Sequence, residues 1–484
     1  MLTLPLDLLF LFAITTPLIG WLAQKVDLPR LSGVYATLGI LLSAFTAFQL
    51  LLQTLGGVVP PTPTSGLFNA YFDLDIFGSF AMVIQIGLGI AASIFSIQYM
   101  RSESGSSLYY ALLIGMIGGM VGVVTAADLF TLFVFWEMMC LTSYLLVAFK
   151  NEEPEPVEAG IKYLLMSSAG SATLLFGISL LYGMTGTLNF GGLATALGHA
   201  TPGPWLYIAL LFIFTGFGVK AAIVPLHTWL PDAHSAAPSP ISAMLSGIVI
   251  ETGLLAMVRV LFTALISLQT YWSMVFAVLA VITMTLGNMT ALVQDDLKRM
   301  LAYSSIGHIG YMLAGLAAGT VVGLTGTILH ILNHALMKGT AFLCAGAIIY
   351  RLGSRNLADM SGLARRMPKI AVAFSIAIFA LIGLPGLNGF VSKLTLFVSV
   401  ADVNLAWVGI AIILNSAISA GYYLRIVRVM IETESEPSEN LREAPVSMWF
   451  PIWILAILII TFGIWPDLVF NIAERAALAI LSMT

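Results

Sequence analysis

Apolar stretches long enough to cross a lipid bilayer fill most of this chain. A helix needs about 20 apolar residues to cross the hydrocarbon core, and we count fourteen stretches of that kind. They lie near residues 4–23, 31–53, 75–99, 107–126, 128–149, 158–184, 205–224, 238–262, 270–292, 297–317, 321–350, 369–399, 404–430 and 446–465. Hydrophobic residues make up 59% of the chain and charged residues 9%, a balance that no soluble core accommodates. We therefore predict an all-α polytopic membrane protein.

The connections between these stretches are short, and none has room for an inserted catalytic domain. Two carry acidic runs, at 151–158 and 432–443. The first stretch lacks the basic start and small-residue cleavage site of a removable signal, so we expect it to be a membrane helix. Cys140 and Cys344 lie in apolar stretches and are expected to pack as small hydrophobic side chains. The sequence predicts no metal site, no cofactor and no nucleic-acid partner.

The basic residues alternate between the two sides of the predicted bundle. Thirteen of the 20 lysines and arginines fall at connections that lead from an odd-numbered to an even-numbered helix. Because such residues are retained on the cytoplasmic side, this side is expected to be cytoplasmic. Both termini then face the opposite side, where Arg475 is the lone basic residue. We predict a multi-pass protein of the cell's inner or plasma membrane.

Two of the predicted spans contain helix-breaking sequences. The seventh span is broken by four prolines that fall between residues 225 and 240, and the twelfth by LIGLPGLNGF at 381–390. Membranes tolerate such breaks only where protein or a polar cavity satisfies the backbone, and matching breaks in two halves indicate inverted repeats. The predicted division is helices one to three (1–106), a first five-helix repeat (107–262), a second (263–430), and a loop, helix fourteen and tail (431–484).

Charged side chains within the spans are the main candidates for a functional site, because each costs about 2.5–3.5 kcal/mol on insertion. They are Glu137, Lys162, Lys220, Glu251, Arg259, Lys338 and Lys393. Lys162 and Arg259 lie near helix ends, from which a long side chain can reach the interface. Glu137 lies too deep in its helix to do so. Static buried ion pairs, such as Glu137 with Lys220, are one interpretation; the excess of lysines over acidic partners favours proton exchange.

Two histidines and a lysine share one face of the predicted eleventh helix. His330, His334 and Lys338 are spaced at i, i+4 and i+8, and histidine can accept and release a proton near neutral pH. We interpret this row as part of a proton relay, since two imidazoles from one helix make a poor zinc site. Three further histidines, for which a relay role and helix capping are alternatives, are His227, His234 and His308.

Four segments carry a family resemblance. They are GFGVKAAIVPLHTWLPDAHSAAPSPISAMLSG, NMTALVQDDLKRMLAYSSIGHIGYM, HILNHALMKGTAFLCAGAI and LPGLNGFVSK, in this order. Over nearly its whole length the chain resembles the antiporter-like subunits of Mrp-type sodium/proton antiporters, respiratory complex I and membrane-bound hydrogenases. The resemblance implies fourteen helices with two inverted repeats of five, and breaks in helices seven and twelve.

The resemblance also implies roles for individual residues. Glu137 would pair with Lys220, Lys393 would be the proton-exchange group at the other end, and the row from His330 to Lys338 would link the halves through water. The lysine at 393 and the chain length look most like the D subunit of an Mrp antiporter. Glu251 departs from the family, which usually has a lysine there. It is interpreted as a relay carboxylate, a cation site or an inert position.

Three functions remain open at this stage. The first is sodium/proton exchange within a multi-subunit membrane complex. The second is proton pumping as a subunit of a redox complex of the complex I or membrane-bound hydrogenase and sulfur-reductase kind. The third is a structural scaffold with an inactive channel. The expected partners are antiporter-like and small membrane subunits, protons, sodium and the bilayer. The chain has no flavin, nucleotide or iron–sulfur motif, so any redox centre would belong to another subunit.

Overall fold

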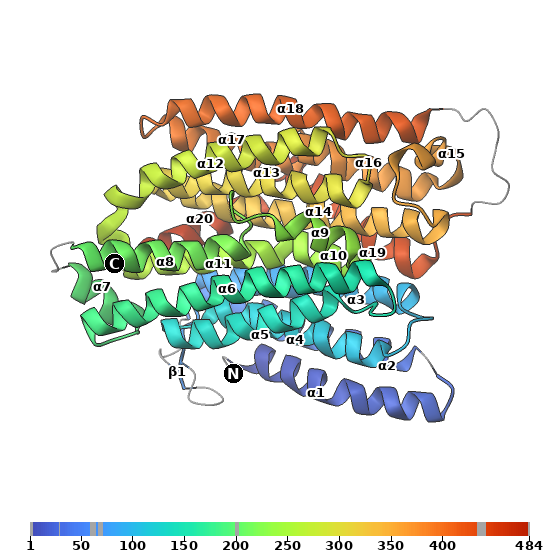
Figure 1. The fold of residues 1–484 in the computed structure, drawn as a ribbon, viewed down its shortest axis with the longest axis horizontal. Helices are drawn as coiled ribbons and strands as arrows, with labels where there is room; N and C mark the ends of the chain where they lie inside the picture. Colours follow the sequence, from blue (N-terminus) through green and yellow to red (C-terminus); the bar gives the residue numbers. More distant parts are fainter. Residues whose placement is uncertain are drawn as a thin grey trace.

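The computed structural model describes residues 3–28, 30–58, 64–65, 71–198, 203–432 and 442–482. These residues form a bundle of long, roughly parallel helices (Figure 1). Eleven helical segments are long and apolar enough to cross a membrane. One small antiparallel pair of strands, β1 (Thr64–Ser65) and β2 (Tyr71–Phe72), lies at one end of the bundle. The prediction of an all-α polytopic membrane protein is confirmed.

The helices of the first half follow the predicted spans closely. They are α1 (Leu4–Lys25), α2 (Leu31–Leu55), α3 (Ile76–Tyr99), α4 (Ser106–Thr125), α5 (Leu129–Val147), α6 (Pro154–Thr185), the short α7 (Phe190–Gly198), α8 (Pro204–Lys220) and α9 (Trp229–Ala236). The eighth span is a composite of α10 (Ser239–Met244), the π-helical turn η2 (Leu245–Val249), α11 (Ile250–Arg259) and a second π-helical turn, η3 (Val260–Ala264).

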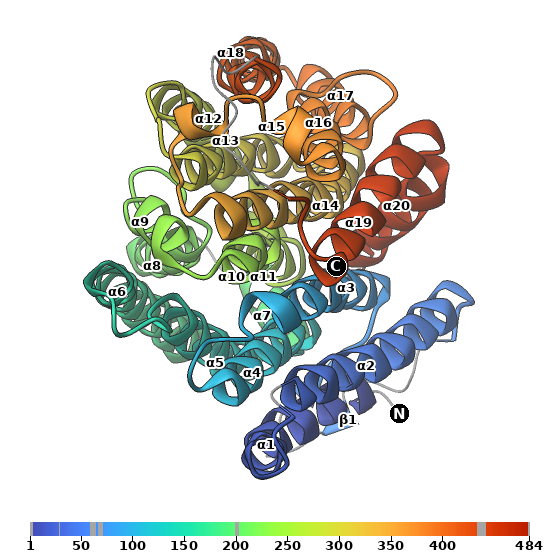
Figure 2. The same ribbon diagram turned by 90° about the vertical axis from the view of Figure 1, so that its right-hand side faces the viewer.

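The second half contains η4 (Ile266–Leu268), α12 (Gln269–Leu292), α13 (Leu297–Ala318), α14 (Val321–Leu352), η5 (Leu357–Met360), α15 (Leu363–Arg366), α16 (Pro368–Ile382), α17 (Asn388–Ala401), α18 (Ala406–Ile431), α19 (Val446–Ile464) and α20 (Asp467–Leu481). Seen end-on, α14 and the α10–α11 helix lie near the middle, whereas α1 and α18 lie at opposite edges (Figure 2). The acidic connection predicted at 432–443 falls mainly outside the described residues.

Both predicted helix breaks are present. In the first, α8 ends at Lys220 and the chain runs without regular helix until α9 begins at Trp229. In the second, α16 ends at Ile382 and α17 begins at Asn388. Gly383 and Gly386 in this second break have φ values of 93° and 88°, a left-handed conformation that glycine adopts without steric cost. Each break leaves backbone carbonyls and amides without helical partners inside the bundle.

The chain continues as a helix beyond the end predicted for the fourteenth span. After Trp465 and Pro466 it forms α20, which packs against α14 and α3. The end of α19 lies on the second helix break, because a Cβ atom on Gly463 would come within 2.4 Å of the Gly386 carbonyl oxygen. Only glycine allows this close approach. Helix α19 therefore ends beside the break between α16 and α17.

Candidate functional site

Three histidines form a buried cluster where α13 meets α14. His308 Nδ1 and His330 Nε2 lie 3.0 Å apart. The rings of His308 and His334 have centroids 4.8 Å apart, and all three side chains are buried. His330 and His334 are one helical turn apart on α14, so α13 presents His308 to both of them. The sequence predicted the row on α14, and the structure adds His308 to the same cluster.

Glu251 on α11 joins the cluster from the eighth span. Its Oε1 atom is hydrogen-bonded to His334 Nδ1, and both side chains are fully buried. Among the described residues neither Glu251 Oε2 nor His334 Nε2 has a hydrogen-bond partner. The π-helical turn η2 ends one residue before α11 begins, and wide turns of this kind are frequent at functional sites. The carboxylate thus faces the histidine row rather than a second acidic group.

Ser392 on α17 connects the cluster to the second helix break. Its hydroxyl oxygen lies 2.8 Å from His330 Nδ1, on the side of the ring opposite to His308. Its neighbour in the chain is Lys393. Sequence reasoning missed Ser392, because a serine within an apolar helix carries no periodic signal of its own. Its position directly before a buried lysine, in a broken helix, was the only available indication.

The ammonium group of Lys393 lies at the broken end of α16. Lys393 Nζ donates hydrogen bonds to the carbonyl oxygens of Leu381 (2.9 Å) and Ile382 (3.1 Å) and to the hydroxyl of Ser416 (3.3 Å). Two of these acceptors are the last carbonyls of α16, which carry the partial negative charge of the helix dipole. The Tyr311 ring lies 4.8 Å from Nζ. This lysine therefore has electrostatic stabilisation without a carboxylate.

Lys338 lies one turn beyond His334 on the same face of α14 and is fully buried. Its Nζ donates to the Leu301 carbonyl oxygen at 2.8 Å and is hydrogen-bonded to the Ser304 hydroxyl, both on α13. The Tyr423 hydroxyl lies 3.5 Å from it. Lys338 thus continues the buried face of α14 that carries His330 and His334, and its hydrogen bonds go to α13 and α18.

The predicted ion pair of Glu137 with Lys220 is not formed as a direct contact between these described residues. Lys220 Nζ donates to the hydroxyls of Tyr163 (2.6 Å) and Ser143 (3.1 Å), and it is buried. Glu137 is half-buried, and its Oε1 atom has no hydrogen-bond partner. Ser143 lies six residues after Glu137 on α5, which is about 9 Å along the helix axis. Lys220 therefore contacts two hydroxyl groups at a different level of α5 from the carboxylate.

Aromatic packing fixes the surroundings of Lys220. The Tyr163 ring is stacked on Trp229 with centroids 4.0 Å apart, and Trp229 Nε1 donates to the Val219 carbonyl oxygen at 2.8 Å. The first residue of α9 is thereby tied to the last turn of α8 across the first helix break. The Tyr163 hydroxyl, a second residue that sequence reasoning missed, is held in place against the lysine.

The lysine at the first break and the central cluster are separate polar groups. No hydrogen bond between described side chains joins Lys220 to Glu251. The two groups are nevertheless held close by backbone packing, because a Cβ atom on Gly253 would lie 3.1 Å from the Ala221 amide nitrogen. Helix α11 thus contacts the first break at Gly253 and the histidine cluster at Glu251.

The remaining predicted histidines lie outside the cluster. His234 is fully buried against Phe342, with ring centroids 5.1 Å apart, and neither of its ring nitrogens has a hydrogen-bond partner among the described residues. His227 is half-buried in the first break, and its Nδ1 atom lacks such a partner. The structure brings neither into contact with the other candidate groups.

Arg259, which was expected to reach the membrane interface, is buried in an ion pair. It is 1% exposed, and its guanidinium forms a two-point ion pair with Asp75, at 2.7 and 3.0 Å. It also donates to the Val124 carbonyl oxygen at 2.8 Å. Asp75 in turn caps α3 by accepting the amide of Gly78 at 2.6 Å. This partner, a capping carboxylate 184 residues earlier in the chain, was not identified from the sequence.

Lys162 and an arginine that sequence reasoning passed over take part in ion pairs near one end of the bundle. Lys162 lies 2.8 Å from Glu158 and 3.1 Å from Asp232, and about half of its side chain is exposed. Arg425, inside the predicted thirteenth span, pairs with Asp295. These exposed pairs are peripheral to the buried cluster and contribute little to stability.

Relatives of known assignment cover most of the chain. Subunit N of the F(420)H(2) dehydrogenase from Methanosarcina mazei is 33% identical over 460 residues, which is 93% of this chain and 92% of that protein. Subunit N of the NADH-quinone oxidoreductase from Moorella thermoacetica is 34% identical over 439 residues, 90% of this chain and 91% of that protein.

Solved structures show the same fold. A chain of the membrane-bound sulfane sulfur reductase, an archaeal respiratory membrane complex, matches with a TM-score of 0.90 and 28% identity over 99% of this chain and 97% of its own. A chain of the Mrp complex from Dietzia sp. matches with a TM-score of 0.88 and 25% identity over 100% and 98%. Residues 126–419 match the family described as NADH:quinone oxidoreductase/Mrp antiporter, TM. The chain therefore belongs to this family of antiporter-like membrane subunits.

Proposed function

We propose that this chain carries protons across the membrane as a subunit of a redox-driven complex. One observation carries the proposal. Ser392, His330 and His308 form a hydrogen-bonded series, His334 and Glu251 form a second pair beside it, and Lys393 and Lys338 flank them, all buried. Buried ionisable groups in a membrane span are costly and mark ion pathways. A static core would not require so many.

The geometry supports stepwise proton transfer. An imidazole can take up a proton at one nitrogen while it releases another from the opposite nitrogen, and His330 has contacts on both sides, to His308 and to Ser392. The free Nε2 atom of His334 and the free Oε2 atom of Glu251 are places where water molecules would extend the path. In this view Lys220 and Lys393 exchange protons at the two breaks, and Glu251 takes the central place that a lysine usually has in the family.

The relatives support a redox-driven complex over sodium/proton exchange. The two curated relatives are N subunits of a dehydrogenase and of an oxidoreductase, and the solved sulfur reductase is a respiratory complex. We infer that other subunits hold the redox centres and contact this chain in the membrane. Sodium/proton exchange of the Mrp D type is a second candidate, because the Mrp chain from Dietzia superposes over the whole length.

The same proposal includes the orientation and the repeats. The end of the bundle with the ion pairs of Lys150 with Glu103 (2.7 Å) and Arg299 with Asp232 (2.7 Å) is proposed to be cytoplasmic. The two inverted repeats would be 107–262 and 263–430. Accessibility of single cysteines introduced near Lys150 and near Arg475 to a membrane-impermeant reagent would test the orientation, because the two sites should react from opposite sides.

The test of function uses membrane vesicles that contain the intact complex. Proton and sodium movements are followed separately, first with the complex driven by its electron donor and then with an imposed pH gradient. Lys393→Ala should stop proton movement in an assembled complex, whereas Lys162→Ala, an exposed lysine, serves as the matched control. Sodium transport driven by the pH gradient alone would favour the second candidate. Proton movement at the wild-type rate in Lys393→Ala would overturn the pathway.

A further inference from the structure

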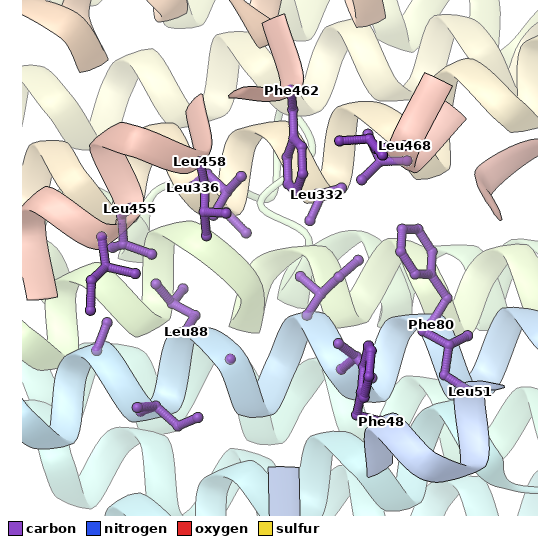
Figure 3. A pocket seen from close by; sticks show the side chains of 18 of the residues that line it. Phe48, Leu51, Phe80, Leu88, Leu332, Leu336, Leu455, Leu458, Phe462 and Leu468 are labelled. Atoms are coloured by element: carbon purple, nitrogen blue, oxygen red, sulfur yellow. The ribbon is translucent and has the colours of Figure 1, made fainter. Parts of the chain in front are cut away.

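A long apolar crevice runs along α3 on the side away from the histidine cluster. Its volume is about 440 Å³, and its walls come from α2, α3, α14, α19 and α20 (Figure 3). All of its lining residues are apolar. Along α3 it extends from Phe80 to Ile94, which is about 21 Å of helix. A single membrane leaflet offers about 15 Å of hydrocarbon, so the crevice is long enough to hold an acyl chain.

The mouth of the crevice opens toward the surface of the bundle. Phe48 on α2 and Leu468 on α20 stand on either side of it, and they are 51% and 57% exposed. Gly87 on α3 leaves the floor open, since a Cβ atom there would meet nothing within 4 Å. In a membrane such a crevice is filled with hydrocarbon rather than left empty or wet.

A second, polar cavity continues from one end of this crevice. Its volume is about 600 Å³. On three helices the first residue that lines the polar cavity lies about one helical turn from the last residue that lines the apolar crevice. Thr54 follows Leu51 on α2, Ile76 precedes Phe80 on α3, and Arg475 follows Ile472 on α20. The two spaces thus lie end to end along the same three helices, apolar at membrane depth and polar at the end of the bundle where α2 ends and α3 begins.

Besides the ion pair of Arg259 with Asp75, the polar cavity is lined by one further basic and one further acidic side chain, Arg475 and Asp73. Arg475 is exposed, and its guanidinium donates one hydrogen bond to the Leu55 carbonyl oxygen, at 2.6 Å. Asp73, in the connection before α3, forms no ion pair with a described residue, whereas Asp75 is already paired with Arg259. Burial raises the pKa of the Asp73 carboxyl, and the charge of Arg259 offsets this only in part. Arg475 and Asp73 would each be stabilised by an oppositely charged group of a ligand.

From this arrangement we propose that the two cavities form one binding site for a membrane phospholipid with a zwitterionic headgroup. One acyl chain occupies the crevice, the phosphate lies at Arg475, and the headgroup ammonium lies at Asp73. Arginine binds phosphate oxygens through charge-assisted hydrogen bonds. The bound chain packs against Leu332 and Leu336, on the face of α14 opposite to the histidine row. The lipid thereby supports the helix that carries the row.

The first test fills the crevice. Gly87→Phe adds a ring to open space, and Gly183→Phe is the matched control, since Gly183 on α6 is also exposed and would also meet nothing within 4 Å. The purified complex is analysed by native mass spectrometry after incubation with phosphatidylethanolamine. We expect Gly87→Phe to lose one tightly bound lipid that the wild type and Gly183→Phe retain. Equal lipid numbers in all three proteins would overturn the proposal.

The second test addresses the headgroup and does not depend on the crevice variant. Arg475→Gln should lower retention of phosphatidylethanolamine about tenfold, as expected for the loss of one charge-assisted hydrogen bond. The wild type should retain phosphatidylethanolamine better than phosphatidylglycerol, which lacks the ammonium, and Asp73→Asn should remove that preference. Equal retention of both lipids by the wild type would refute the assigned headgroup.

Other occupants give other results. A photo-reactive residue at Phe48 should crosslink to lipid, because that side chain stands at the mouth of the crevice. Crosslinking to a protein subunit of the complex, or recovery of quinone in place of phospholipid, would each contradict the proposal. None of these measurements requires proton transport, so they test the lipid site independently of the proposed function.

Discussion

The Glu251→Gln substitution distinguishes two roles of Glu251, a member of a proton relay and a purely structural contact. The substitution keeps the size of the side chain and leaves a carbonyl oxygen that can face His334. What it removes is the ability to take up or release a proton. The cost in folding free energy is limited to the difference between a hydrogen bond with a charged partner and one without, about 0.5–2 kcal/mol. We therefore expect the complex to assemble.

The effect on proton movement should be much larger than this. Glu251 is fully buried and holds the only contact between α11 and His334 among the described side-chain hydrogen bonds. If protons pass through the carboxylate, its replacement should slow them at least tenfold, which corresponds to about 1.4 kcal/mol in the barrier. Glu251→Ala is a poor substitute for this test, because it leaves His334 without a partner and opens a cavity, at a combined cost of about 3 kcal/mol or more.

The assay is proton flux in vesicles, normalised to complex assembled on a native gel. Glu251→Lys introduces the lysine that the family resemblance leads us to expect at this position, and it should retain part of the flux if the position works as a relay. Sodium dependence is measured in parallel. Wild-type proton flux in Glu251→Gln would remove this carboxylate from the path. Loss of sodium dependence with proton flux intact would instead identify a cation site.

Lys220→Ala should abolish proton flux in vesicles. The complex should still assemble, because the hydroxyl groups around Lys220 remain to hydrate the site. Wild-type flux in this variant would remove the lysine from the path. Ser392→Ala should slow flux severalfold, since His330 Nδ1 loses its partner at 2.8 Å, and an unchanged rate would show that protons bypass Ser392. Asp75→Asn should lower stability by about 3–5 kcal/mol and Arg259→Met by a similar amount. The double variant should lose clearly less than the sum in a thermal unfolding cycle, and additive losses would show that the pair contributes nothing.

The sequence predicted the architecture well because its signals are local. Fourteen apolar stretches, two proline and glycine breaks and the spacing of His330, His334 and Lys338 all depend on neighbours in the chain. The structure places helices over the predicted stretches and breaks at both predicted sites. The last predicted span, 446–465, agrees with α19, whereas α20 in the tail was not predicted, because it follows a Trp–Pro pair and is amphipathic rather than uniformly apolar.

The contacts that complete the site could not be predicted in the same way. Asp75 lies 184 residues from Arg259, and Ser143 and Tyr163 lie 77 and 57 residues from Lys220. Such partners are set by how helices pack, which a single sequence does not encode locally. The expected pair of Glu137 with Lys220 came from a resemblance. It failed as a direct contact because hydroxyl groups already satisfy the lysine.

The hydrogen bonds of Lys393 determine which groups provide its counter-charge. Its ammonium is stabilised by the carbonyl ends of α16, and these backbone groups cannot be protonated. Gain or loss of a proton at Lys393 therefore leaves its counter-charge unchanged. A lysine that faces a carboxylate would exchange charge with a partner that also titrates, and the two steps would be linked. At this end of the molecule the peptide backbone thus acts as a fixed counter-charge for the lysine.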